Sequence, residues 1–361
     1  MSRTTPARPS YTVSPLGSLE TARDTWKPLA DVNGNLFGTW EWAWAWWSVY
    51  SRGRQAHIYA AGPPGQTPRA VLPLYSHVAH PVPLWRFIGD GPADMLGPVC
   101  APADRADTAE ALRSLVDTAP GRAVAVRVDG GDGWASLLGA RTLRRQACPV
   151  LDVGERSWDE WLASKSKNFR EQVRRRERSL SRKHGLQFRL ITGEPGRREA
   201  LNTLIALHDA RWNNGSRVFS PDRRRFMERF TALAARQGWL RLWTAELDGR
   251  PAAAWLGFRF GGADWYYAAG RDPAWAQASV GFVLFMRTIR DAFEAGSREY
   301  RMLLGAEPFK QRISTTDRGL ETIVVGRGPL PGLMTMLAGA ARKLPAAGKD
   351  RLAERLQGVR A

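Results

Sequence analysis

A short segment late in the sequence holds residue types suited to proton transfer. Residues 305–310 read Gly-Ala-Glu-Pro-Phe-Lys and follow a predicted strand over 299–304. A loop at a strand end can present the Glu307 carboxylate to take a proton from an attacking amine. It can also present the Lys310 ammonium to stabilise developing negative charge. The alternative is a surface turn with a solvated ion pair.

Residues around the start of a predicted helix over 280–295 are suited to binding phosphate. Free N–H groups and the dipole at a helix N-terminus favour anions, and a glycine there lets a ligand approach the backbone closely. Every helix has such an end, so an ordinary helix start is the alternative. The candidates for cofactor binding are Arg271, Ser279, Val280, Gly281 and Phe282.

A third group lies on a predicted helix over 196–213. His208, Arg211 and Trp212 are spaced i, i+3, i+4 and therefore share one face. These side chains together suit an anionic or amine-bearing ligand, and His208 is a second candidate for the base. The alternative for His208 is a structural role. The candidates for substrate binding are Arg211, Trp212, Tyr267, Arg170 and Arg174.

The elements that must position these residues alternate between helix and strand. Asp248-Gly249 between two apolar runs predicts a hairpin. Ser157 with Glu160 three residues later predicts the start of one helix that runs to about residue 183. The second half predicts strands over 186–192, 239–247, 251–260, 263–270, 299–304 and 320–325. The first half holds a tryptophan-rich helix over 38–51 and several strands, so the fold class is mixed α/β (α+β).

The basic excess is concentrated in the middle of the sequence. The formal net charge is +18. Residues 1–140 hold 12 basic and 12 acidic side chains, residues 141–236 hold 23 and 11, and residues 237–361 hold 18 and 12. Local positive charge concentrates anionic partners. We therefore expect a phosphate-bearing donor or acceptor, and no general affinity for nucleic acid.

Composition and motif content exclude several classes of protein. With 43% hydrophobic and 24% charged residues, the chain has a globular composition. It has no run of about 18 apolar residues, no N-terminal signal segment, and two cysteines without zinc spacing. It also lacks a P-loop, an early G-x-G-x-x-G and a G-x-S-x-G motif. We expect a cytoplasmic, metal-free protein that is not a nucleotide hydrolase, a Rossmann dehydrogenase or a serine hydrolase.

The order of these motifs resembles the GNAT-fold acyltransferases, and more specifically their CelD-like branch, which is related to the FemAB-type aminoacyl transferases. The resemblance is densest over residues 157–312 and rests on segments such as SKSKNFREQVRRRERSL, LHDARW and GRDPAWAQASVGFVLFMRTIRDAFEAGSREYRMLLGAEPFKQRIS. It implies tandem GNAT-like lobes, each a largely antiparallel mixed sheet flanked by helices. The implied parts are a flexible N-terminus over 1–14, lobes over 15–150 and 151–326, and a basic helical tail over 327–361.

Family motifs map onto the candidate residues. Ser279 and Gly281 match a Ser-Pro-Gly turn with valine in place of proline. Glu307 and Lys310 match the charged residues of Glu-Pro-Tyr-Lys, with phenylalanine in place of tyrosine. His-x-x-Arg-Trp matches residues 208–212.

The resemblance implies transfer of an acyl group, with acetyl as the first expectation, from acyl-CoA to an amine or hydroxyl. Several relatives are linked to polysaccharide or cell-envelope synthesis. One alternative keeps the fold and takes aminoacyl-tRNA as the donor. Another is a non-catalytic binding module of an envelope-synthesis complex, because Ala306 stands where aspartate is usual and residues 277–281 and 300–301 also depart from the family pattern. Two positions are open for the helical tail. It could lie on the inner face of the membrane as a peripheral contact, or it could pack on the second lobe.

Overall fold

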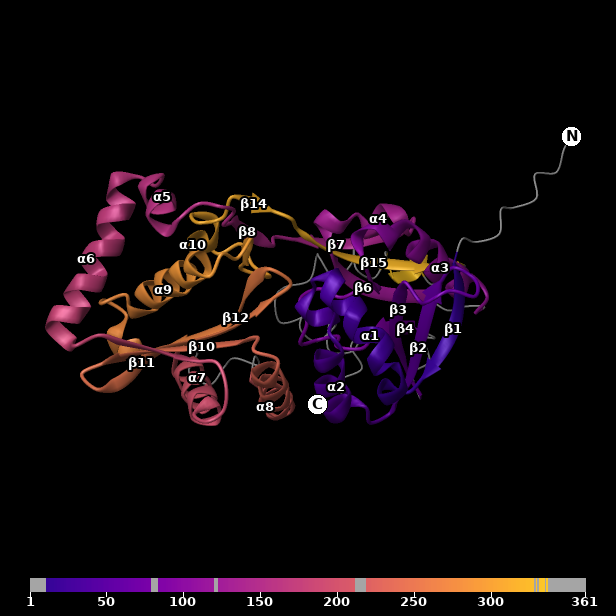
Figure 1. The fold of residues 1–361 in the computed structure, drawn as a ribbon, viewed down its shortest axis with the longest axis horizontal. Helices are drawn as coiled ribbons and strands as arrows, with labels where there is room; N and C mark the ends of the chain where they lie inside the picture. Colours follow the sequence, from indigo (N-terminus) through magenta and orange to yellow (C-terminus); the bar gives the residue numbers. More distant parts are fainter. Residues whose placement is uncertain are drawn as a thin grey trace, which may run out of the picture. The chain divides into compact units, whose positions relative to one another are not determined.

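Figure 1 shows the computed structural model of the chain. It describes residues 11–78, 84–119, 123–211, 219–327, 329, 331–334 and 336. The chain divides into two units, Met1–Ala147 with Arg318–Ala361, and Cys148–Asp317. Each unit is built on one mixed sheet with helices beside it, which confirms the predicted fold class. The predicted tail over 327–361 lies almost entirely outside the described residues.

The first unit contains an eight-stranded sheet in the order β1-β2-β3-β4-β6-β15-β7, with β5 paired to β3. The neighbours β4 and β6 run parallel, and the other described pairs are antiparallel. The strands are β1 (Thr12–Gly17), β2 (Arg54–Gly62), β3 (Ala70–His77), β4 (Leu84–Phe87), β5 (Val99–Cys100), β6 (Ala123–Asp129), β7 (Arg141–Gln146) and β15 (Leu320–Gly326). The helices are α1 (Leu19–Asn33), α2 (Trp40–Tyr50), α3 (Arg105–Asp117) and α4 (Trp134–Leu137).

Local signals set the ends of the first two helices. Ser18 and Thr21 form a capping box at the start of α1, which ends at Gly34 in the left-handed conformation. The predicted tryptophan-rich helix is α2, and the Thr39 side chain accepts from the N–H of Trp42 at its start. Trp42 and Trp46 of α2 are buried in the core of the unit. Burial of these large aromatic side chains is a main stabilising contribution there.

The second unit contains a seven-stranded sheet in the order β14-β8-β13-β12-β11-β10-β9. Again one pair, β12 with β13, is parallel, and the other described pairs are antiparallel. The strands are β8 (Pro149–Asp152), β9 (Gln187–Ile191), β10 (Leu240–Leu247), β11 (Arg250–Phe260), β12 (Ala263–Arg271), β13 (Glu299–Arg301) and β14 (Thr316–Asp317). The helices are α5 (Trp158–Ala163), α6 (Lys167–His184), α7 (Arg197–Arg211), α8 (Pro221–Arg236), α9 (Val280–Glu294) and α10 (Pro308–Gln311).

Two strands join sheets that the linear order of the sequence does not suggest. The strand predicted over 320–325 was assigned to the second lobe, but as β15 it pairs with β6 and β7 of the first sheet. Its Ile323 and Val324 are buried there. The flexible N-terminus predicted over 1–14 includes residues 12–14, but these residues belong to β1, which pairs with β2. Both corrections have the same cause, because strand pairing depends on partners far away in the sequence.

The helices of the second unit cover both faces of its sheet (Figure 1). α9 lies on one face, on the same side as α5 and α6, whereas α7 and α8 lie on the other. The predicted single helix over 157–183 is in fact two helices, α5 and α6, because Ser166 starts a new helix by accepting from the N–H of Phe169. Phe169 and Val173 of α6 are buried in the core formed with α9.

Candidate functional site

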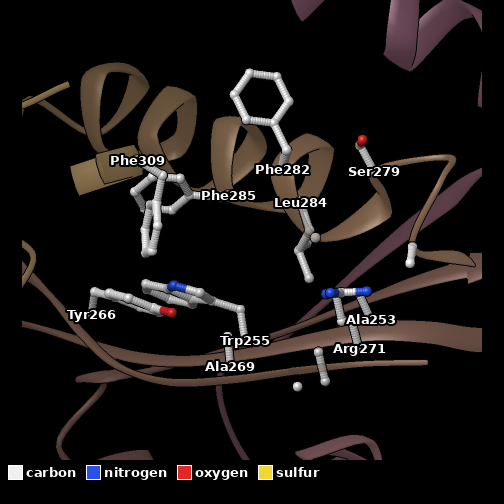
Figure 2. A pocket seen from close by; sticks show the side chains of 14 residues that line it. Ala253, Trp255, Tyr266, Ala269, Arg271, Ser279, Phe282, Leu284, Phe285 and Phe309 are labelled. Atoms are coloured by element: carbon white, nitrogen blue, oxygen red, sulfur yellow. The ribbon is translucent and has the colours of Figure 1, made fainter. Parts of the chain in front are cut away.

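A cavity of about 300 Å³ lies between α9 and the part of the sheet formed by β11 and β12 (Figure 2). β12 pairs with β13 over residues 263–265, but it continues to Arg271. The later part of β12 therefore extends past the end of its parallel neighbour β13, which stops at Arg301. The cavity occupies the space beside this part of the strand, and Phe309 of α10 borders it as well.

One end of the cavity carries positive charge and free backbone donors. Arg271, the last residue of β12, rises from the strand toward α9 (Figure 2). A Cβ at Gly281 would lie 3.3 Å from Cδ of Arg271. Val280 and Gly281 are the first residues of α9, so their N–H groups have no acceptor within the helix. This end can bind an anion such as a phosphate group.

The other predicted cofactor-binding residues contribute in different ways. Ser279 lines the cavity, has a left-handed backbone with φ of +60°, and makes no side-chain bond to the helix. The side chain of Val280 is fully buried in the core, so Val280 offers the site only its N–H. The ring of Phe282 turns away from the sheet in Figure 2 and contacts α6, with Phe169 6.1 Å away between ring centres.

Aromatic side chains surround the other end of the cavity. The rings of Trp255 and Tyr266 are 5.8 Å apart between centres and within 6° of parallel. Phe285 of α9 lies 5.7 Å from Tyr266 and 5.4 Å from Phe309, to which it is perpendicular. Figure 2 shows the two phenylalanine rings above Trp255 and Tyr266. This end of the cavity is therefore suited to an apolar group.

A β-bulge decides which of two neighbouring tyrosines faces the cavity. Strict alternation from Arg271 would place Tyr267 on the cavity face. The register between β11 and β12 shifts at this point, so that Gly257 is opposite Tyr266 and Tyr267 is the extra residue. Tyr266 therefore lines the cavity. Tyr267, the predicted substrate-binding residue, instead accepts a 3.2 Å hydrogen bond from Arg223 of α8 on the other face.

The segment after β13 brings Glu307 and Lys310 together. The Lys310 ammonium donates to the Leu304 carbonyl at 2.7 Å, lies 3.1 Å from the Glu307 carboxylate, and is 5.7 Å from the centre of the Tyr266 ring. The lysine side chain is 5% exposed and the glutamate side chain 51%. Lys310 therefore contacts both the accessible Glu307 carboxylate and Tyr266 of the cavity wall, whereas Glu307 is not among the lining residues. The prediction of a solvated ion pair is wrong for the buried lysine.

The same segment contains unusual backbone conformations. Leu303 is buried and has φ of +58°, and Gly305 has φ of +130°. A Cβ at Gly305 would lie 2.2 Å from Oε2 of Glu307, so a larger residue there would displace the carboxylate from this position. Among the described residues, Asp248, Ser279 and Leu303 are the non-glycine residues with positive φ. Two of these three lie in the segments that flank the cavity, and strained backbone of this kind tends to collect at functional sites.

The structure does not bring His208 to this cavity. His208 is buried on α7, and its Nδ1 lies 3.2 Å from the carbonyl oxygen of Ala269. α7 packs on the opposite face of the sheet from α9 (Figure 1), and a Cβ at Gly270 would lie 2.5 Å from the backbone nitrogen of His208. The close packing of α7 on β12 thus requires glycine at 270, and His208 is separated from Glu307 by the sheet.

The remaining predicted substrate-binding residues lie away from the cavity or outside the described residues. Arg170 of α6 donates to the Ala163 carbonyl at the end of α5, at 3.1 Å. Arg174 is exposed on α6. Trp212 and the side chain of Arg211 are not among the described residues. Sequence reasoning missed four aromatic residues of the cavity, because aromatic residues in a strand or helix resemble ordinary core: Trp255, Tyr266, Phe285 and Phe309.

Buried polar contacts hold β12 and β13 to α9 next to the cavity. Arg259 of β11 donates to both carboxylate oxygens of Asp264 at 3.0 and 3.1 Å and lies 2.7 Å from Asp291 of α9. Burial raises the pKa of Asp264, although Arg259 acts in the opposite direction. Tyr300 of β13 is fully buried 2.8 Å from the Thr288 hydroxyl, and burial raises the pKa of Tyr300 well above its usual value.

Comparison with known proteins agrees with this geometry. Residues 167–311 match the family model of the acetyltransferase (GNAT) domain. The matched residues lie within the second unit. No curated protein matches the chain in sequence.

Solved structures share the fold over most of the chain. FemX is 14% identical, with 88% of this chain and 98% of FemX covered at a TM-score of 0.61. The C-terminal domain of a protein from Agrobacterium fabrum described as a lysylphosphatidylglycerol synthetase is 12% identical, with 88% and 96% covered at 0.58. L-PGS from Bacillus licheniformis is 13% identical, with 88% and 96% covered at 0.55. These identities establish a shared fold alone.

Two further properties concern the described part of the chain. None of its helices combines the length and apolar character needed to cross a bilayer. No group of three or more His, Cys, Asp or Glu side chains within it is placed to hold a metal ion.

Proposed function

We propose that the second unit transfers an acyl group from an acyl-CoA donor to an amine or hydroxyl acceptor. The observation that carries the proposal is the cavity itself, which joins an anion-binding end at Arg271 and the start of α9 to an apolar end at Tyr266 and Phe285. An acyl-CoA has the same polarity along its length, with phosphates at one end and the acyl thioester at the other.

The chain's residues suit both ends of such a donor. The N–H groups of Val280 and Gly281 and the Arg271 guanidinium would bind the pyrophosphate. The pantetheine arm would then run along β12, past Ala269, toward the aromatic side chains. A cavity of about 300 Å³ is at the lower end of the range for small-molecule sites. It can hold the arm and the acyl group, with the nucleotide outside.

The reaction needs a proton acceptor beside the thioester. The nitrogen lone pair of an amine acceptor attacks the thioester carbon, a C–N bond forms, and the C–S bond breaks. The ammonium proton passes to a base, and coenzyme A leaves as a thiolate that takes up a proton. Glu307 is our candidate base because its carboxylate is half exposed and is held by Lys310, whose ammonium lies near the Tyr266 ring. Lys310 acts as a positioning residue, because its ammonium is already bound to Leu304 and Glu307.

Calorimetry with acyl-CoAs and a thiol-release assay with a panel of amines test this proposal. The full chain should bind acyl-CoA and release free thiol only when an accepted amine is present. Glu307→Gln should lower kcat by about 100-fold or more and leave donor binding unchanged. The matched control is Glu228→Gln on α8, which removes a carboxylate of similar exposure that is paired with Arg198 of α7. Absence of acyl-CoA binding, or equal kcat in all three proteins, would contradict the proposal.

A second candidate donor is aminoacyl-tRNA, and the surface of α6 favours it. Arg174, Arg175 and Arg178 of α6 are exposed, and no ion pair involves them among the described residues. Such a surface suits a nucleic-acid backbone, whose binding weakens steeply with salt, with a logarithmic slope of about −0.7 per phosphate contact on single strands. Titration with tRNA at two salt concentrations separates the donors. Salt-dependent tRNA binding that Arg174→Glu weakens, without any change in acyl-CoA binding, would favour this candidate.

A further inference from the structure

The indole N–H of Trp255 is a buried hydrogen-bond donor without an acceptor at the aromatic end of the cavity. The Trp255 side chain lines the cavity, and the residue is 2% exposed. Its Nε1 atom exposes less than 1 Å² and has no hydrogen-bond partner among the described residues. Figure 2 shows this nitrogen on the edge of the ring that faces the phenylalanine side chains of α9 and α10.

Three other buried tryptophans of the chain have an acceptor for this group, whereas Trp161, away from the cavity, has none within the described part of the chain. Trp26 donates to the Gly38 carbonyl at 2.8 Å, Trp46 to the Asp90 carbonyl at 2.8 Å, and Trp265 to the Phe260 carbonyl at 3.1 Å. A buried donor without an acceptor is costly, so folded proteins rarely leave one unpaired. At the wall of a ligand cavity, the missing acceptor can come from the ligand.

We propose that the transferred acyl group carries an oxygen atom beyond its thioester carbonyl, and that this oxygen accepts a hydrogen bond from Trp255 Nε1. The inference rests on the proposed function and names the class of donor, an oxygen-bearing acyl-CoA such as a hydroxyacyl-CoA. The other aromatic residues at this end of the cavity, Tyr266, Phe285 and Phe309, pack against the hydrocarbon part of the acyl group. Because Nε1 exposes less than 1 Å², a neighbouring ring must shift for the oxygen to reach it, and Phe309, 38% exposed on a four-residue helix, borders the same cavity.

This arrangement selects between acyl groups of similar size. A plain hydrocarbon chain would fill the aromatic end of the cavity and leave the Trp255 N–H without an acceptor, whereas an oxygen-bearing chain supplies one. Sites built to hydrogen-bond a substrate discriminate against analogues that lack the bonding group. The net gain from one hydrogen bond corresponds to an affinity for the oxygen-bearing donor about 3- to 10-fold higher than for the plain hydrocarbon donor.

The test compares butyryl-CoA with 2-, 3- and 4-hydroxybutyryl-CoA by calorimetry on the full chain. We expect at least one hydroxylated donor to bind about 3- to 10-fold more tightly than butyryl-CoA. Trp255→Phe keeps an aromatic ring and removes the N–H, so the ratio of hydroxylated-donor affinity to butyryl-CoA affinity should fall to about onefold. Trp161→Phe is the matched control, because its indole nitrogen is also buried without a partner but lies outside the cavity lining. That variant should keep the full preference.

The outcomes separate this inference from the proposed function. If no acyl-CoA binds, the proposed function fails. If all four donors bind the unmodified chain equally, the acyl-CoA site stands and the inference is overturned. The inference is also overturned if Trp255→Phe weakens every donor equally, since the N–H would then serve the thioester carbonyl or general packing. The comparison on the unmodified chain decides the preference even if the Trp255 variant fails to fold.

Discussion

The Lys310 ammonium lies 3.1 Å from the Glu307 carboxylate, and of the two side chains only that of Glu307 is open to solvent, at 51% against 5% exposure. The same ammonium donates to the Leu304 carbonyl. A buried cation with two bonded acceptors is held in place, and it fixes the direction of the carboxylate beside Tyr266. The order of burial therefore assigns positioning to the lysine and proton transfer to the glutamate.

Lys310→Met tests this division of roles. Methionine keeps most of the side-chain length but leaves the Leu304 carbonyl without its donor, so we expect a loss of about 1–3 kcal/mol in the free energy of unfolding. We also expect kcat to fall about tenfold or more, because Glu307 is no longer held. The Kd for acyl-CoA should stay unchanged, since the anion-binding end at Arg271 is untouched. A parallel loss in kcat and donor affinity would show that the effect is only structural.

Arg271→Ala tests the anion-binding end of the cavity. Removing a guanidinium that bonds to phosphate should weaken acyl-CoA binding about tenfold or more, because hydrogen bonds between charged groups are the stronger kind. Calorimetry measures the change directly. Arg225→Ala on α8 removes the same charge from an exposed ion pair with Asp222 and should leave the Kd unchanged. Equal weakening in both variants would point to net charge instead of a site at Arg271.

Substitutions at Ser279 measure the backbone strain at the start of α9. Its φ is +60° and its side chain makes no cap bond, so Ser279→Gly should relieve a left-handed backbone cost of about 1–2 kcal/mol. The greater entropy of glycine in the unfolded chain offsets about 0.5–1 kcal/mol of this. A net stabilisation of about 0.5–1 kcal/mol should appear in urea unfolding. Ser279→Ala, which keeps the strain, should be near neutral, and equal stability of the two variants would argue against stored strain.

Tyr300 should make stability depend on pH in the alkaline range. Its pKa is raised in the folded state by burial, whereas an unfolded tyrosine titrates near pH 10. The contribution of Tyr300 to the free energy of unfolding is therefore complete below about pH 10. It is lost as the pH rises above that value, because the tyrosine of the unfolded state loses its proton first. Tyr300→Phe should reduce the alkaline fall in the urea midpoint. Tyr59→Phe, at a half-buried position, should leave that fall intact, and an identical fall in both variants would contradict the assignment.

The local features of the fold could be predicted from the sequence because they depend on neighbouring residues. The capping box at Ser157 and Glu160 starts α5 as predicted, and Asp248-Gly249 forms the turn between β10 and β11. The start of α9 also lies at the predicted residue, although Ser279 before it makes no side-chain cap bond. Caps and turns are set by hydrogen bonds within a few residues, so the sequence contains the whole signal.

The composition of the site depended on contacts that are distant in the sequence. A β-bulge places Tyr266 and not Tyr267 in the cavity, and a single inserted residue reverses which side chains face the helix. The sheet separates His208 from Glu307, although both match motifs of the same resemblance. Which face a side chain takes is fixed by register and packing, and the spacing of residues in the sequence does not record either.

The sequence by itself therefore determined the class of fold, the helix start that suits phosphate, and the carboxylate and ammonium that follow β13. The tertiary structure decided that β15 completes the first sheet, that Lys310 is buried against Glu307, and that Trp255 brings an unpaired donor to the cavity. The physical reason is the distance in sequence over which each interaction acts. Backbone caps and turns are local interactions, whereas strand pairing, burial and the facing of side chains arise only when distant segments meet.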